Sequence, residues 1–304
     1  MSSHIHIAIL DDYQGVALEL ADWSNMQSKA SIDVYRDTIH DEDQLAKRLE
    51  PYTIYITTTG FVNRSIDMVA AAAKGIIVTG TGGYGDPTLE HIWALFFEVA
   101  RSIAVEDKNV KNANPQWQTL IPIGLSGKTL SLLGVGRLGG KTAKIAKLFG
   151  MRVLGWSPNL TKERAEAAGV ELAESKEDLF KQADFLSIHL VLAPSTRHLV
   201  GKAELAALKP TAFFFNTSRG PIVDEEALLD TLYNKRIAGA GLDVYDIEPL
   251  PLNHPLRKAP NVVLTPHNAY ISDDNYKAWW SGTAQNVSNY LEGKELRAIL
   301  NGKE

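Results

Sequence analysis

The chain has 304 residues, of which 45% are hydrophobic and 22% are charged, so it is long enough for about two globular domains and too apolar for a disordered or fibrous protein. Its net charge of −5 gives no basic surface for phosphate backbones, so we expect no nucleic-acid partner. Neither a long apolar span nor a secretory signal is found, so we expect no membrane partner and a cytoplasmic protein. The absence of cysteine excludes disulfides and thiolate metal sites, and we predict no metal site.

Short apolar runs rich in β-branched residues alternate along the chain with stretches of helical spacing. The expected strands are HIAIL near the N-terminus and residues 32–36, 52–58, 76–80, 129–134, 151–156, 183–190, 211–217, 238–244 and 261–266. The expected helices between them are residues 41–50, 65–75, 141–150, 175–182 and 224–235. Because the strands are apolar at successive positions, both faces of each strand should be covered. The pattern predicts an α/β protein with doubly wound parallel sheets.

Two long helix candidates predict where the chain passes between domains. Thr88–Val105 is apolar and is followed by a polar, turn-rich stretch before a new strand begins at Thr129. A second candidate runs from about Ser272 to Leu291 and can return the chain to the first domain. We therefore predict a discontinuous domain of residues 1–97 and 274–304, and a second domain of residues 98–273.

Glycines at 134, 136 and 139 have the spacing G-x-G-x-x-G within a strand–turn–helix–strand unit. Gly134 allows a tight turn, Gly136 allows a pyrophosphate to approach the helix N-terminus, and Gly139 allows close packing of helix and strand. The loop, which also contains Arg137 and Leu138, predicts a dinucleotide site. The alternative is a turn with a purely structural role.

The end of the next strand discriminates between the two nicotinamide dinucleotides. An NAD site usually has Asp or Glu there, whereas this chain has Trp156, Ser157 and Pro158. No carboxylate repels a 2′-phosphate, and Lys162 and Arg164 follow closely. We therefore favour NADP(H), with NAD(H) possible; the alternative is that both cations are simply solvated.

Three polar residues, Arg219, Glu248 and His267, follow strands of the second domain, where ligands of open α/β sheets bind. Arg can hold a carboxylate through two hydrogen bonds, and His is the natural proton donor to a developing alkoxide. A Glu beside the His favours its charged form. The alternatives are a turn residue, a helix cap and a buried histidine.

These segments together resemble the D-isomer-specific 2-hydroxyacid dehydrogenase family, which includes phosphoglycerate dehydrogenases and glyoxylate/hydroxypyruvate reductases. The resemblance covers nearly the whole chain and rests on GVGRLGG, SIHLVLAPSTRHLVG, FFFNTSRGPIVDEEALLDTL, GLDVYDIEP and NVVLTPHNA. It implies a Rossmann cofactor domain inserted in a smaller flavodoxin-like substrate domain. It also implies a homodimer, with residues 88–125 as the crossing helix and dimerisation arm.

The resemblance implies a role for each site residue in hydride transfer between NAD(P)H and a small 2-keto or 2-hydroxy acid. His267 is the acid–base group, Glu248 is its partner, and Arg219 orients the substrate. The implied cofactor contacts are Gly134, Gly136, Arg137, Leu138, Gly139, Ser157, Pro158, His189, Thr217 and Asp243, with Asp243 at the nicotinamide carboxamide. The implied substrate contacts are Thr59, Gly60 and Arg219.

One departure from the family concerns the substrate domain, which lacks a helix–strand unit near residues 52–60. The family's proline after His189–Leu190 is also replaced, by Val191. These departures motivate a second hypothesis, a dinucleotide-sensing interaction protein with little or no turnover. The complete set of Arg219, Glu248 and His267 favours the enzyme.

Overall fold

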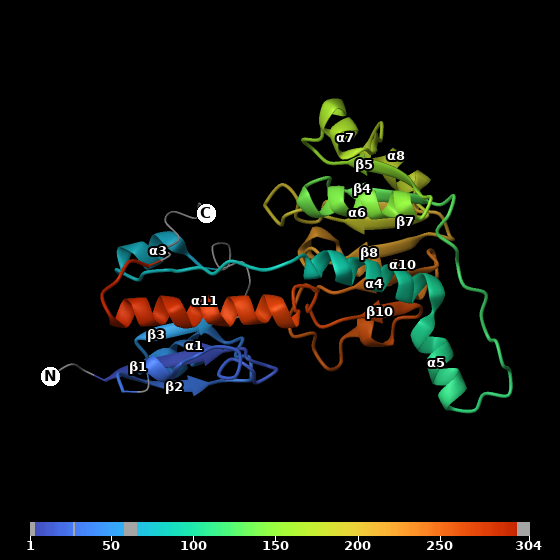
Figure 1. Ribbon diagram of the computed structural model, residues 1–304. Coiled ribbons are helices and arrows are strands. Elements are labelled where there is room, and N and C mark those ends of the chain that lie inside the picture. Colours follow the sequence, from blue (N-terminus) through green and yellow to red (C-terminus); the bar gives the residue numbers. More distant parts are fainter. Residues whose placement is uncertain (1–3, 27, 58–65, 297–304) are drawn as a thin grey trace. The chain divides into compact units, whose positions relative to one another are not determined.

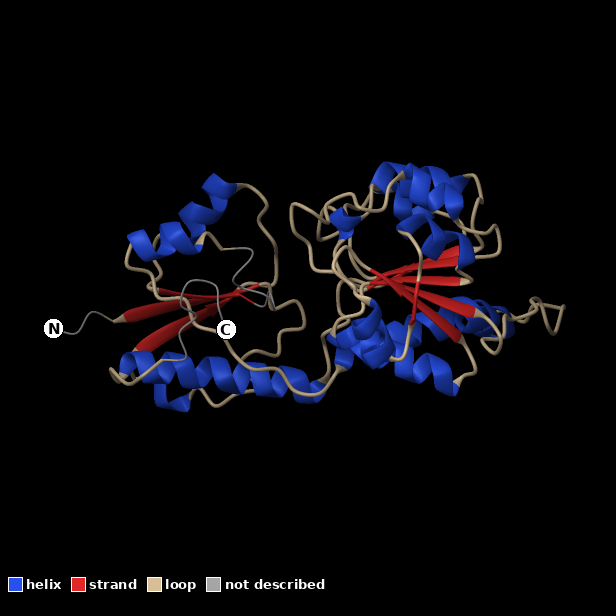
Figure 2. Cartoon of the chain, turned by 90° about the horizontal axis from the view of Figure 1, so that it is seen from above, coloured by secondary structure: helices blue, strands red, loops and turns tan. Residues whose placement is uncertain are grey.

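The structure is a computed structural model that describes residues 4–26, 28–57 and 66–296. The chain divides into two compact units, residues 1–85 with 271–304 and residues 86–270. Each unit has a parallel sheet with helices on both of its sides (Figures 1 and 2), as the sequence predicts. The predicted boundaries, at 97/98 and 273/274, lie inside or at the start of long helices. In the structure each of these helices belongs whole to one unit, so the boundaries lie in the connections at 85/86 and 270/271.

The described part of the first unit contains a three-stranded sheet in the order β2-β1-β3. Its central strand is buried at Ile7, Ala8 and Ile9, because helices cover both faces of the sheet. Ser272 caps the long last helix by accepting the N–H of Asn275. The elements are β1 (Ile5–Leu10), η1 (Ser24–Met26), β2 (Ala30–Val34), α1 (Glu42–Leu49), β3 (Ile54–Thr57), α3 (Met68–Ala73) and α11 (Asp273–Leu291).

Of the strand predicted at residues 76–80, the structure has a single β-bridge residue, Thr79. Ile76 and Ile77 lie outside the described strands, and their side chains are exposed. Apolar β-branched residues favour a strand only where a neighbouring strand accepts their backbone hydrogen bonds.

The second unit contains a seven-stranded sheet in the order β10-β9-β8-β7-β4-β5-β6, with every pairing parallel. Its strands are β4 (Thr129–Leu133), β5 (Arg152–Trp156), β6 (Glu171–Leu172), β7 (Phe185–Ile188), β8 (Phe213–Asn216), β9 (Gly239–Leu242) and β10 (Val262–Leu264). Its helices are α4 (Pro87–Arg101), α5 (Ile103–Lys111), α6 (Arg137–Leu148), α7 (Lys162–Ala168), α8 (Lys176–Gln182), α9 (Lys202–Ala207) and α10 (Glu225–Tyr233), with 3-10 turns η2 (Gly220–Ile222) and η3 (Pro255–Lys258).

Strand β8 shows why successive apolar residues are needed in this sheet. Phe213 and Phe215 pack in the cluster formed with α4 and α6, whereas Phe214 packs in the cluster formed with α8, α9 and α10. Side chains of a strand alternate between its faces, so a sheet covered on both faces needs apolar residues at every position.

The single helix predicted over Thr88–Val105 is broken in the structure. Ser102 has φ +51°, in the left-handed region, and its N–H bonds to the Glu98 carbonyl, so α4 ends there and α5 starts at Ile103. An apolar pattern does not reveal a left-handed residue within a helical stretch, and this is the reason for the difference.

The parallel sheet places the carboxyl ends of its strands at one edge. After β4 the chain adds β5 and β6 on one side and then β7, β8, β9 and β10 on the other. Ligands of open parallel sheets bind beyond the carboxyl ends of the strands, at the point where the order reverses. Here that point is the glycine loop that follows β4.

Candidate active site

The glycine loop joins β4 to α6, and close backbone contacts require two of its three glycines. Gly134 has φ +107°, and a Cβ there would lie 2.6 Å from the carbonyl oxygen of His189. A Cβ on Gly139 would lie 2.3 Å from the Gly134 carbonyl oxygen. Gly136 has φ −87° and no atom of the described chain within 4 Å of its Cβ position. The fold does not require glycine at 136, so this open cradle at a helix N-terminus fits a bound pyrophosphate.

His189 follows β7 and lies directly against this loop. Its Nε2 is buried and has no hydrogen-bond partner within the described residues. Burial lowers the pKa of His189 to about 4, so the ring is neutral at pH 7. Asn268, which follows β10, has a second such atom, its buried Oδ1. Buried polar atoms are normally satisfied, and these two are groups that a ligand at this edge can satisfy.

The segment predicted to hold the adenosine ribose joins β5 to α7. It begins with Ser157 and Pro158, and the guanidinium of Arg164 donates to the carbonyl of Asn159 at 3.0 Å. Lys162 instead lies 3.9 Å from Glu166 of its own helix. Of these two cations, Arg164 is therefore the one that contacts this segment.

His267 and Glu248 form a direct pair. The distance between His267 Nδ1 and Glu248 Oε2 is 2.5 Å, and the other carboxylate oxygen accepts the Tyr245 N–H at 2.8 Å. The side chains are 29% and 32% exposed, so the pair is accessible to a small molecule. Because Nδ1 faces the carboxylate, Nε2 is the ring atom available to exchange a proton with a substrate.

The loop carrying Arg219 follows β8 and packs tightly against the segment that leads to Glu248. A Cβ on Gly220 would lie 2.1 Å from the Tyr245 carbonyl carbon, so only glycine allows this approach. The loop is braced by the Asn216 amide, which donates to the Arg219 carbonyl at 2.9 Å. Thr217 lies between these residues, directly after the strand.

Asp243, which follows β9, is fully buried and holds the loop that carries His267. Its carboxylate accepts the Thr265 hydroxyl at 2.6 Å and the N–H groups of Asn268 and Ala269 at 3.0 Å each. This bracing is independent of the predicted contact with a nicotinamide, which stays a prediction.

Three residues of this arrangement, Tyr245, Thr265 and His91, were not predicted from the sequence. Tyr245 donates its hydroxyl to the Thr265 carbonyl at 2.8 Å, and burial raises the pKa of this tyrosine. His91, on α4, lies 3.0 Å from the Thr265 hydroxyl oxygen. No spacing in the sequence relates His91 to the other two, because the contact depends on how α4 crosses the sheet.

The predicted substrate residues Thr59 and Gly60 lie outside the described residues. Within the described residues, no cluster of three or more His, Asp or Glu side chains could hold a metal ion, and no helix has the length and apolarity to cross a membrane.

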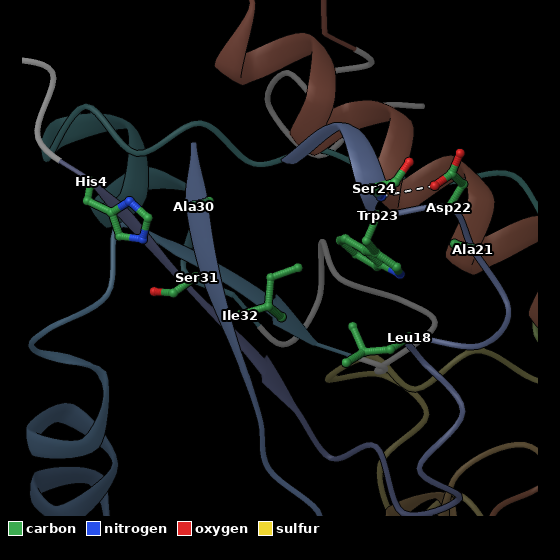
Figure 3. A pocket seen from close by; sticks show the side chains of 9 residues that line it. All are labelled: His4, Leu18, Ala21, Asp22, Trp23, Ser24, Ala30, Ser31 and Ile32. Carbon is green, nitrogen blue, oxygen red and sulfur yellow. Dashed lines mark hydrogen bonds between the residues drawn. The ribbon is translucent and has the colours of Figure 1, made fainter. Parts of the chain in front are cut away.

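An open surface pocket lies in the first unit, where the carboxylate of Asp22 accepts the N–H of Ser24 (Figure 3). Its lining residues are His4, Leu18, Ala21, Asp22, Trp23, Ser24, Ala30, Ser31 and Ile32. None of the predicted site residues is among them, and we assign it no ligand.

Comparison with known proteins identifies the family. Residues 93–269 match the model described as D-isomer specific 2-hydroxyacid dehydrogenase, NAD binding domain. A glyoxylate reductase of Aeropyrum pernix is 36% identical over 309 residues, which cover 99% of this chain and 91% of that protein. The chain belongs to this family. A D-3-phosphoglycerate dehydrogenase of Methanocaldococcus jannaschii is 35% identical over 238 residues, covering 78% of this chain and 45% of that protein.

A solved family structure also has a similar length. The phosphoglycerate oxidoreductase of Vibrio cholerae has a TM-score of 0.87 and 31% identity, over 95% of this chain and 99% of that one. The small first unit is therefore not peculiar to this chain. As a 2-hydroxyacid dehydrogenase, the chain is an NAD(P)-dependent oxidoreductase acting on a CH–OH group. The predicted family and enzyme class are confirmed, and the sensing alternative is not favoured.

Proposed function

We propose that this 2-hydroxyacid dehydrogenase reduces a small 2-keto acid, with His267 as acid–base group, Glu248 as its partner and Arg219 orienting the substrate. The observation that carries the proposal is the 2.5 Å contact between His267 and Glu248. The loops of all three residues follow neighbouring strands of the sheet whose switch point holds the glycine loop. The second unit is proposed to bind the cofactor, and Thr59 and Gly60 are proposed to contact the substrate.

Each side chain has one task in the proposed reduction. A bound reduced nicotinamide supplies the hydride. Arg219 binds the substrate carboxylate or carbonyl through its forked N–H groups. His267 carries a proton at Nε2 and transfers it to the substrate oxygen as negative charge develops there. Glu248 accepts from Nδ1 throughout, which holds the ring in one orientation. In the direction of oxidation, Nε2 takes the proton back.

The substrate is proposed to be glyoxylate or hydroxypyruvate, because a relative that aligns along nearly the whole chain is named a glyoxylate reductase. The test is the loss of absorbance at 340 nm when NADPH or NADH is mixed with glyoxylate, hydroxypyruvate, pyruvate or phenylpyruvate. We expect turnover with at least one of the first two. Tight binding of the cofactor without turnover on any of the four acids contradicts the proposal and restores the sensing hypothesis.

NADPH is the proposed cofactor, because Arg164, in the first turn of α7, donates to the segment after β5, and Ser157 stands where an NAD site usually has a carboxylate. We expect Arg164→Ala to raise the Kd for NADPH about tenfold and to change that for NADH less than about twofold. Fluorescence titration with both cofactors measures this effect. Lys162→Ala is the matched control, since Lys162 pairs along its own helix, and it should leave both constants unchanged. Equal weakening of both cofactors by Arg164→Ala contradicts the preference.

The second unit is proposed to form a homodimer through the arm made of α5 and residues 112–125. Glu106 holds the extended part against α5 by accepting the N–H of Thr119 at 3.0 Å, yet Trp117 and Ile121 are 76% and 94% exposed. Figure 1 shows this arm projecting from the sheet of its unit. Exposed apolar patches of this kind mark protein interfaces.

We expect light scattering during gel filtration to give twice the mass of one chain, and Trp117→Ser with Ile121→Asp to give the mass of one chain. A wild-type protein that elutes as one chain at micromolar concentration overturns the dimer.

The proposed localisation of the protein is cytoplasmic.

A further inference from the structure

His91 on α4 is a polar side chain that the proposed reaction does not use. It is 19% exposed, and its Nε2 lies 3.0 Å from Thr265 Oγ1 and 3.5 Å from Asp243 Oδ1. We propose that His91 is a positioning residue: its Nε2–H donates to the Thr265 hydroxyl, which fixes the loop that presents His267. This inference rests on the proposed function in giving His267 the acid–base role.

The direction of the hydrogen bonds follows from counting protons. The Thr265 hydroxyl has one proton, which it donates to Asp243 Oδ1 at 2.6 Å. The contact between His91 and Thr265 must therefore use a proton on His91 Nε2. That proton is present both in the Nε2–H tautomer and in the imidazolium. If the ring carried a proton on Nδ1 alone, a lone pair of His91 Nε2 would face a lone pair of Thr265 Oγ1.

The loop needs several restraints because His267 has φ +51°, in the left-handed region that non-glycine residues rarely adopt. Such a conformation persists only when its surroundings determine it. Asp243 holds the loop after His267 through two N–H groups, and Tyr245 holds the Thr265 carbonyl. His91 holds the Thr265 hydroxyl from a helix outside the loop.

Helix α4 is itself fixed close to His91. Asp86, the residue before its first turn, forms ion pairs with Arg137 and Lys141 of α6. Further along, Phe96 packs against Phe215 of β8 with ring centroids 4.3 Å apart. A helix held at its start and in the core can hold His91 at a constant position relative to the loop.

Two substitutions separate the hydrogen bond from the space that the ring fills. We expect His91→Phe to lower kcat about 10- to 100-fold while the Kd for NADPH changes less than about twofold. His91→Gln offers an amide N–H near the position of Nε2 and should recover most of kcat. A His91→Phe variant with wild-type kcat, or Gln and Phe variants that are equally slow, overturns the inference.

Thr265→Val provides a double-substitution cycle. If His91 acts through the Thr265 hydroxyl, Thr265→Val combined with His91→Phe should be no slower than Thr265→Val alone. Losses that multiply would show two independent effects and overturn the inference. If His91→Phe does not fold, His91→Asn, whose shorter amide does not reach Thr265, replaces it in the cycle with the same expectation.

A measurement independent of turnover distinguishes this inference from the proposed function. Long-range ¹H–¹⁵N spectra of histidine-labelled protein, assigned by the signal lost in His91→Gln, should show His91 protonated at Nε2. A proton on Nδ1 alone overturns the inference, whatever the activity. With a protonated Nε2 but no turnover on any 2-keto acid, the proposed function fails while the hydrogen bond stands.

Discussion

Replacing His267 by Gln should lower kcat about 10² to 10⁴-fold, the range typical for loss of a general acid. Gln keeps polarity and approximate size but cannot carry the proton that the histidine holds at Nε2. The Kd for NADPH should change little, because the ring contributes to the chemical step. Steady-state kinetics at saturating cofactor, with a separate fluorescence titration, measure the two quantities.

A second His–Glu pair in the same unit provides a matched control. His254 Nε2 lies 3.0 Å from Glu225 Oε1, in a part of the unit to which we assign no role in the reaction. His254→Gln removes a comparable pair and should leave kcat within about twofold of wild type. If both substitutions reduce kcat equally, or if His267→Gln is fully active, His267 is not the acid–base group.

Replacing Gly136, Gly139 and Gly140 one at a time by alanine should distinguish the glycine required for stability from the glycine required for cofactor binding. Gly139→Ala places a Cβ 2.3 Å from a backbone oxygen, so it should lower the free energy of unfolding by about 1–3 kcal/mol. Gly136→Ala meets no atom of the described chain. It should leave stability unchanged and raise the Kd for NADPH about 10- to 100-fold, because the Cβ fills the space where the pyrophosphate approaches.

Gly140→Ala is the control, since its Cβ position is also open and it lies inside α6. Alanine is the better helix former there, so stability should stay equal or rise slightly, with unchanged cofactor affinity. Urea unfolding and fluorescence titration of the three variants complete the test. Undiminished affinity in a folded Gly136→Ala protein contradicts the placement of the cofactor at this loop.

Much of the second unit is predictable from the sequence because its signals are local. The continuous apolar run of β8 indicates that both faces of the strand are covered, and the glycine spacing indicates a close turn between β4 and α6. The Ser272 cap marks where the last long helix begins.

Other features depend on contacts between distant segments and are not visible in a local pattern. The left-handed residue at Ser102 divides one apolar stretch into two helices, and Ile76 and Ile77 lie outside the described strands. The bracing by Tyr245 and His91 requires the folded positions of β9, β10 and α4. The residues proposed to perform the reaction are therefore visible in the sequence, whereas Tyr245, Thr265 and His91, which hold their loops, are not.

We expect the glycine loop and His267 to belong to one site for a nicotinamide dinucleotide and a 2-keto acid. A crystal structure with NADPH and oxamate, a stable analogue of a small 2-keto acid, would show whether both ligands lie there. We expect the pyrophosphate at Gly136 and the first turn of α6, and an oxamate oxygen hydrogen-bonded to His267 Nε2. A cofactor bound away from residues 134–139, or oxamate bound out of reach of His267, would contradict it.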